Sequence, residues 1–275
     1  MKRRQALGVM AGAAAAPAII TRAQAADTLD PVKDMALILR KLSHAKDEKV
    51  HFWWMMGTRS GLVDSAYTPL WDMHVGTIFS VRDIDADSYE VTSLGLNWYT
   101  DLTTGKFLET FRNPYTGKDL KVPYAPPKPS KRIYDKSGLK VPPFERPGVT
   151  MKRTGATGPA WIEGNDVWVR GDTSVRGEPT TQGGKIFQVN DMSTFFGATK
   201  DVANPKVTSA PAGQAFSDLN TWPDWLEMGD KPGNYYSRCF GRKVDSIAAM
   251  PKPWREITEA KFPAIAKDPA GALKG

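Results

Sequence analysis

The chain has a single cysteine, Cys239, among 275 residues. One thiol cannot form an intrachain disulfide, so the fold has to be held together by its core. The same scarcity excludes metal sites built from paired cysteines. Cys239 lies in a strand-like run, residues 236–240, and we interpret it as a buried, unreactive thiol.

Phosphate-binding and nucleophile-elbow motifs are absent as well. No Gly-x-Gly-x-x-Gly run follows a strand pattern, and no phosphate loop ends in Gly-Lys-Ser or Gly-Lys-Thr. A Gly-x-Ser-x-Gly elbow is also missing. The sequence therefore gives no indication of a bound nucleotide or of a serine hydrolase, and we expect no cofactor.

Excess positive charge is concentrated in the first 25 residues, which hold Lys2, Arg3, Arg4 and Arg22. Without these four, 37 − 4 = 33 basic residues face 30 acidic ones, a net charge of +3 instead of +7. A balance so close to neutral, with both signs interspersed, is typical of an ordinary solvated surface. We therefore expect no nucleic-acid partner.

The same 25 residues have the pattern of a secretory signal peptide. The pair Arg3-Arg4 precedes an apolar run over 6–20, and an Ala-x-Ala site ends at Ala25. Paired arginines indicate the twin-arginine export machinery as a partner. The apolar run of about 15 residues is shorter than the roughly 20 that span a bilayer. We predict cleavage after Ala25, a periplasmic mature domain over 26–275, and no stable membrane anchor.

Aromatic residues are abundant, and glycine and proline are frequent. The chain has 9 Trp, 8 Tyr and 11 Phe, with 24 Gly and 21 Pro. Many short strands joined by Gly/Pro turns favour a single mostly-β barrel or sandwich. Helical spacing of apolar residues predicts a short amphipathic helix over 28–43, and a second helix over 254–262 that Pro263 ends.

Alternation predicts where the strands lie. In the first strand, His51, Trp53 and Met55 share one face, while the opposite face is equally apolar, so we expect burial on both sides. We interpret 122–148 as a long irregular loop and 197–213 as a polar loop. The predicted strands are 50–56, 71–82, 88–99, 106–112, 159–163, 167–172, 185–192 and 235–244.

Three segments resemble a known bacterial family. They are YTDLTTG at 99–105, FRNPYTG at 111–117 and WLEMGDKPG at 225–233, followed by Pro253-Trp254. Together they look like the family called "domain of unknown function 1838", over roughly residues 45–265. The resemblance implies a mostly-β domain similar to a closed, lipocalin-type barrel, often exported, with a cavity for one small ligand. It implies no catalytic residues.

The three histidines are the first candidates for chemistry, because histidine titrates near neutral pH. His44 ends the first helix, and we expect it to face solvent. His51 and His74 lie in aromatic-rich strands and would be acid–base groups if both point into the barrel. The alternative is that they are core histidines. No helical histidine pair indicates a metal site, and we expect none.

Further candidates combine arginine or tyrosine with neighbouring aromatic rings. We assign Tyr99 as a hydrogen-bond donor or general acid and interpret Asp101 as a turn residue. Arg170 is grouped with the catalytic candidates. An arginine among aromatic rings can bind a carboxylate or a phenolate, and the alternative is a stem lying on the barrel exterior. The substrate-binding candidates are Trp53, Arg59, Trp98, Arg112 and Trp168.

These residues suggest a cofactor-independent lyase or isomerase acting on a small hydrophobic aromatic compound. One version is loss of formaldehyde from a lignin-type aromatic dimer, with His51 or His74 as the base and Tyr99 and an arginine stabilising the phenolate. A second hypothesis is a non-catalytic periplasmic binding protein for a small hydrophobic ligand. A third is a structural envelope protein, which leaves the aromatic richness unused.

Overall fold

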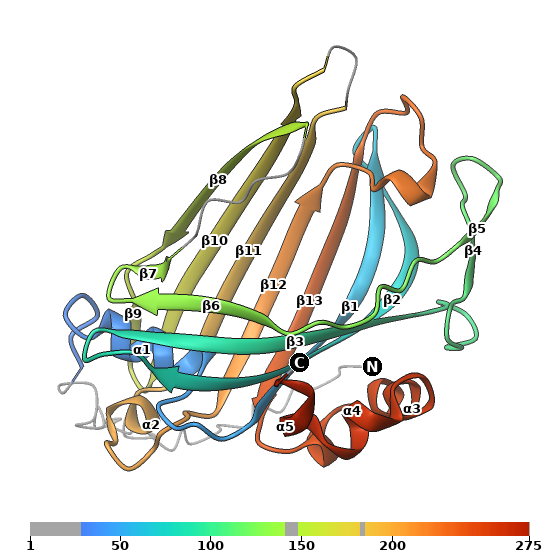
Figure 1. Ribbon diagram of the computed structural model, residues 1–275. Helices are drawn as coiled ribbons and strands as arrows, with labels where there is room; N and C mark the ends of the chain where they lie inside the picture. Colours follow the sequence, from blue (N-terminus) through green and yellow to red (C-terminus); the bar gives the residue numbers. More distant parts are fainter. Residues whose placement is uncertain (1–28, 141–147, 182–184, 275) are drawn as a thin grey trace, which may run out of the picture.

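The computed structural model describes residues 29–140, 148–181 and 185–274. The predicted signal peptide and its cleavage site lie outside the described residues. One large sheet curls into a nearly closed barrel, with short helices at one end and on one side (Figure 1). The prediction of a mostly-β barrel with a helix near each end of the domain is therefore confirmed.

Ten strands follow one another around the barrel in the order β7-β6-β3-β2-β1-β13-β12-β11-β10-β8, and β9 pairs with β10. Every pairing in this sheet is antiparallel. The strands are β1 (His51–Val63), β2 (Ala66–Asp83), β3 (Ser88–Thr100), β6 (Ser130–Asp135), β7 (Gly138–Lys140), β8 (Val149–Thr157), β9 (Trp161–Glu163), β10 (Asp166–Pro179), β11 (Phe187–Ala198), β12 (Ala212–Asn220) and β13 (Asn234–Val244).

The barrel has one seam, between β7 and β8. No backbone pairing joins these strands within the described residues. The two edges nevertheless approach closely, because a Cβ on Gly138 would lie 2.8 Å from Thr157 Oγ1. The positive φ of 106° at Gly138, which a glycine adopts without strain, forms the tight β6–β7 turn.

Two predicted loops contain regular structure. The segment 122–148 was interpreted as irregular, but β6 and β7 pair there with the edge of β3. The segment 197–213 contains the end of β11, a short helix α2 (Thr199–Ala203) and the start of β12. The predicted strand over 106–112 is reduced to an isolated bridge at Phe107 and a short β4 (Thr110–Arg112), which pairs with β5 (Asp119–Lys121) in a hairpin.

Helix α1 (Met35–Ser43) packs at one end of the barrel interior, because its apolar stripe carries Ile38, Leu39 and Leu42 into the core. Aromatic and apolar side chains fill the other end, under the β4–β5 hairpin and the 3₁₀ turn η2 (Asp224–Leu226). The space between these two cores is where the cavity lies.

The C-terminal segment covers the outer face of β1–β3. It comprises η3 (Ile247–Ala249), α3 (Lys252–Lys261), α4 (Pro263–Lys267) and α5 (Pro269–Ala272). Trp254 is fully buried and lies against Gly76, where a Cβ would be only 2.2 Å from the indole ring. This explains why β1 is apolar on both faces: Trp53 belongs to the interior core and Phe52 to the core under the helices. Among the described residues, no helix is long and apolar enough to cross a membrane.

Candidate functional site

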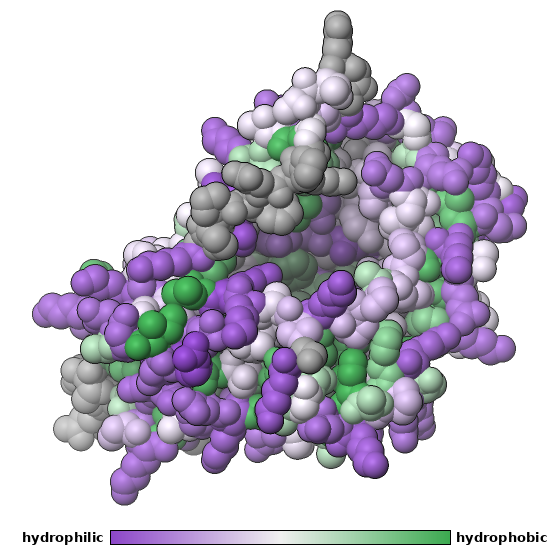
Figure 2. All heavy atoms as spheres, in the orientation of Figure 1, coloured by the Kyte–Doolittle hydropathy of each residue, from purple (hydrophilic) through white to green (hydrophobic). Residues whose placement is uncertain are grey.

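A cavity of about 440 Å³ lies inside the barrel beside α1. Figure 2 shows a hollow on the face where the cavity opens. Its volume falls within the range of small-molecule sites. Aromatic rings line its walls on four strands: Trp53, Phe79, Phe195 and Phe216. Such a lining suits a flat apolar ligand.

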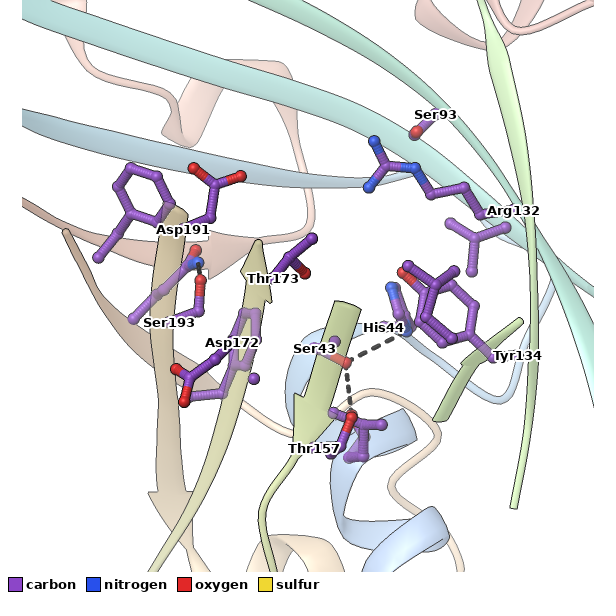
Figure 3. A pocket seen from close by; sticks show the side chains of 18 of the residues that line it. Ser43, His44, Ser93, Arg132, Tyr134, Thr157, Asp172, Thr173, Asp191 and Ser193 are labelled. Carbon is purple, nitrogen blue, oxygen red and sulfur yellow. Dashed lines mark hydrogen bonds between the residues drawn. The ribbon is translucent and has the colours of Figure 1, made fainter. Parts of the chain in front are cut away.

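Charged groups also face the cavity, from strands on both sides of the seam. Arg132 comes from β6, Arg153 from β8 and Asp191 from β11. Within the described residues, no ion pair joins either arginine to a carboxylate. Figure 3 shows the Arg132 side chain reaching from one wall toward the space that Asp191 and Thr173 border on the other. Arg132 also forms a hydrogen bond with the Tyr134 hydroxyl, but no described carboxylate neutralises the charge of either guanidinium group.

Asp191 is the carboxylate that stands out in this wall. Burial raises its pKa, and the negative charge of Asp218 raises it further, while Arg59, Arg132 and Arg153 act in the opposite direction. Among the described residues, none donates a hydrogen bond that would stabilise the ionised Asp191 carboxylate. An acid with a raised pKa in a cavity is poised to exchange a proton with a ligand.

Strand register places Asp191 in a polar row that crosses the barrel wall. The aligned positions run from Thr173 to Asp191, then to Asp218, Ser237 and Arg59. Arg59 Nη1 donates to both oxygens of Asp218, at 2.6 and 2.7 Å, and the Ser237 hydroxyl and amide also donate to Asp218. Asp218 is thus fully engaged, whereas its neighbour Asp191 is not.

His44 forms part of the cavity floor next to α1. Burial, together with the positive charges of Lys243, Arg132 and Arg40, lowers its pKa to about 3. The ring is therefore neutral at physiological pH, and its Nδ1 lies 3.2 Å from both Ser43 Oγ and the Tyr89 hydroxyl. The expectation that His44 faces solvent is wrong, because the turn after α1 directs it between Phe79, Tyr89 and Tyr134.

The structure places three of the predicted site residues inside the barrel. Trp53 lines the cavity, and its indole donates to the Ser43 carbonyl at 2.8 Å. Arg59 and Tyr99 face the same interior but lie in the neighbouring aromatic core, where Tyr235 packs under the Arg59 guanidinium at 3.9 Å. Burial raises the pKa of Tyr99, so its phenol stays protonated.

Both strand histidines lie away from the cavity lining. His51 is at the barrel end, where its Nε2 pairs with Asp47 Oδ1 at 2.7 Å and its ring stacks on Phe79. His74 is on the outer face of β2, with Nε2 3.1 Å from Thr100 Oγ1. Neither position brings a base to the cavity.

Four further candidates also lie outside the cavity. Trp98 is covered by α3, and its indole donates to Thr258 Oγ1. Arg170 is exposed and pairs with Asp172, and Arg112 is exposed and pairs with Asp119 on the β4–β5 hairpin. Trp168 faces outward opposite Trp161. Each of these residues lies on the outer side of a strand or in a hairpin. Alternation shows which residues share a face of a strand, but it does not show which face points into the barrel.

Sequence reasoning did not select His44, Arg132, Arg153 or Asp191. Arg132 lies in the segment interpreted as an irregular loop, and Arg153 lies on β8, a strand that was not predicted. Asp191 is in a predicted strand, on the same face as Ser193 and Phe195. A charged residue on that face was the one sequence feature that could have indicated a site there. Asp101 behaves as predicted, because its carboxylate accepts from the amides of Thr103 and Thr104 in a turn.

Comparisons with known proteins add a family. The family model described as "Protein of unknown function (DUF1838)" matches residues 47–274. No curated protein matches the chain. A crystal structure from Bacteroides fragilis, described as an exported protein with a YMCC-like fold, is similar at 9% identity over 71% of this chain and 96% of that chain. Its TM-score of 0.23 is too low for any conclusion about this chain.

Proposed function

The chain belongs to the DUF1838 family, and we propose that it is a cofactor-independent lyase that cleaves a small aromatic compound inside the barrel. One observation carries the proposal: Asp191, a carboxylate with a raised pKa, shares an aromatic-lined cavity with the guanidinium groups of Arg132 and Arg153, which form no ion pair with a described carboxylate. A base and two cations around one apolar space are what such a reaction requires.

The reaction that this set of groups fits best is the loss of formaldehyde from a lignin-type aromatic dimer. The substrate carries a hydroxymethyl group on one carbon, and the adjacent carbon bears an aryl ether oxygen. Asp191 takes the hydroxyl proton, the bond to the hydroxymethyl carbon breaks, and formaldehyde leaves. The freed electron pair forms a carbon–carbon double bond and expels the aryl oxygen as a phenolate. The phenolate is then protonated, so the reaction needs no oxidant.

Each cavity group has a role in this scheme. Arg132 and Arg153 stabilise the phenolate charge as it develops, in a site partly shielded from water. Trp53 and Phe195 hold the rings. The role of base, predicted for His51 or His74, passes to Asp191. Arg59 acts one layer further in, where it holds Asp218 beside Asp191, and Tyr99 forms a hydrogen bond with Tyr235, which packs under Arg59.

Purified residues 26–275, without added cofactor, should convert a hydroxymethyl-bearing aromatic dimer to formaldehyde and an unsaturated phenol, detected by mass spectrometry. Asp191→Asn should abolish turnover while retaining ligand binding. Asp166→Asn, an exposed carboxylate on the outer side of β10, is the matched control. Retention of the dimer without turnover would favour the second candidate, a binding protein for a hydrophobic ligand, which the same aromatic lining supports.

We also propose that the protein is exported by the twin-arginine route and works in the periplasm after cleavage at Ala25. The support is the arginine pair and the Ala-x-Ala pattern. Expression of the full chain, cell fractionation and N-terminal sequencing test this directly. A mature N-terminus at Ala26 in the periplasmic fraction is expected, and full-length protein in the cytoplasm would overturn the proposal.

A further inference from the structure

The outer wall of the barrel over β11, β12 and β13 has an unusual composition. Asp191, Asp218 and Ser237 face the barrel interior. Because side chains alternate along a strand, the positions next to them face outward. The side chains between them point away from the barrel. Among them are Met192 and Phe196 on β11 and Arg238, Phe240 and Arg242 on β13.

This outward set, which we call the β11–β13 face, combines exposed apolar side chains with arginine. Phe240 is 63% exposed, Met192 44% and Phe196 40%. Arg238 and Arg242 flank Phe240 along β13, and both are exposed. Because Phe240 is exposed to water between two arginines, its side chain adds little buried apolar surface to stabilise the fold.

The charge on the face has one sign. The outward side chains of these three fully described strands include two arginines and no acid. Neither arginine forms an ion pair with another described residue. The C-terminal helices pack mainly over β1–β3 and reach this face only at its edge, where Val244 packs against the core beneath them.

We propose that the β11–β13 face binds the surface of an anionic lipid bilayer. Guanidinium groups pair with lipid phosphates, and flanking aromatic and apolar side chains enter the headgroup region. A lipid surface fits better than a second copy of the chain, because two such faces would place like charges together. The proposal does not depend on the lyase activity, since the cavity lies on the opposite side of the strands.

Vesicle co-sedimentation of purified residues 26–275 tests the proposal. The protein should sediment with vesicles containing phosphatidylglycerol and remain in solution with pure phosphatidylcholine, and salt should weaken the binding. The double variant Arg238→Gln/Arg242→Gln should lose about tenfold or more of the affinity, given the contribution of each arginine near an anionic surface. Phe240→Ser should weaken binding at unchanged net charge.

Matched controls separate this face from general charge. Arg112→Gln/Arg176→Gln removes one exposed and one partly exposed arginine elsewhere, and Ile133→Ser removes another exposed apolar side chain. Both should bind like the wild type, with thermal unfolding confirming that every variant is folded. Absence of binding to anionic vesicles, equal binding to neutral ones, or equal losses in the controls would overturn the proposal. So would an Arg238- and Arg242-dependent dimer in sedimentation velocity without vesicle binding.

Discussion

Asp191 and Asp218 lie directly opposite each other on β11 and β12, and among the described residues a guanidinium binds Asp218 but none binds Asp191. Two neighbouring carboxylates in different environments acquire different proton affinities. Asp218 is held as a structural anion by Arg59 and Ser237, and Asp191 is left to titrate at the cavity wall. This difference underlies the chemistry we propose.

The buried Arg59–Asp218 pair should be important for stability. Arg59→Met leaves Asp218 buried without its cation, and breaking such a pair typically costs about 3–5 kcal/mol. Urea unfolding measures the loss. The exposed pair of Arg112 with Asp119 is the control, since Arg112→Met should cost less than about 1 kcal/mol. If Arg59→Met lowered the free energy of unfolding no more than Arg112→Met does, the buried Asp218 carboxylate would not need Arg59 for its stabilisation.

Asp191 should make the fold less stable at neutral pH. Its pKa is higher in the folded protein than its ordinary value of 3.8, so the folded state binds the proton more tightly than the unfolded state. That contribution is present at acid pH and is lost as the pH rises through the raised pKa. Asp191→Asn should therefore be more stable than the wild type at neutral pH, and the difference should shrink toward acid pH.

Thermal unfolding across this pH range measures the effect, with Asp166→Asn as the control that should show no such trend. A less stable Asp191→Asn variant at neutral pH would mean that the carboxylate is paired in the folded protein.

Arg132 and Arg153, which face the cavity from the two sides of the seam, should favour ligands with a negative charge. Arg132→Gln and Arg153→Gln should each weaken binding of an aromatic carboxylate or phenolate by about tenfold or more, because a hydrogen bond to a charged group is lost. Binding of the uncharged methyl ether or ester should change little. Isothermal titration calorimetry measures both ligands, with the exterior Arg170→Gln as the control. Equal losses for charged and uncharged ligands would assign the arginines a structural role.

Docking of the C-terminal helices should depend on Gly76. A Cβ there would overlap the Trp254 indole, so Gly76→Ala should destabilise the protein by about 1–3 kcal/mol through overpacking. Gly95→Ala on the neighbouring strand meets nothing within 4 Å and should be tolerated. Urea unfolding compares the two variants, and equal stability would show that α3 does not dock tightly on β2.

The sequence predicts the architecture well where burial is strong. Alternation in β1 places Trp53 and Phe52 on opposite faces, and the structure has Trp53 in the interior and Phe52 under the C-terminal helices. The first and last predicted helices correspond to α1 and α3 because their apolar spacing is helical. Strands β6, β8 and β12 are missing from the prediction. In β6 and β8 the exposed positions are polar, with Arg132 and Arg153 among them.

The site is harder to predict than the fold, since it depends on which face of each strand points inward. His74 and Tyr99 lie in aromatic-rich strands, yet one points outward and the other inward. Asp191 becomes notable only when register places it beside Asp218, which is 27 residues away along the chain. Long-range pairing of this kind leaves no local pattern in the sequence.

The most direct test is single-turnover mass spectrometry of residues 26–275 with a hydroxymethyl-bearing aromatic dimer, comparing the wild type with Asp191→Asn. General-base catalysis predicts formaldehyde release by the wild type and a loss of about 100-fold or more in the variant at unchanged ligand affinity. In the wild type, the rate should fall as the pH is lowered through the raised pKa of Asp191. Undiminished turnover by Asp191→Asn would contradict the assignment of this carboxylate as the base.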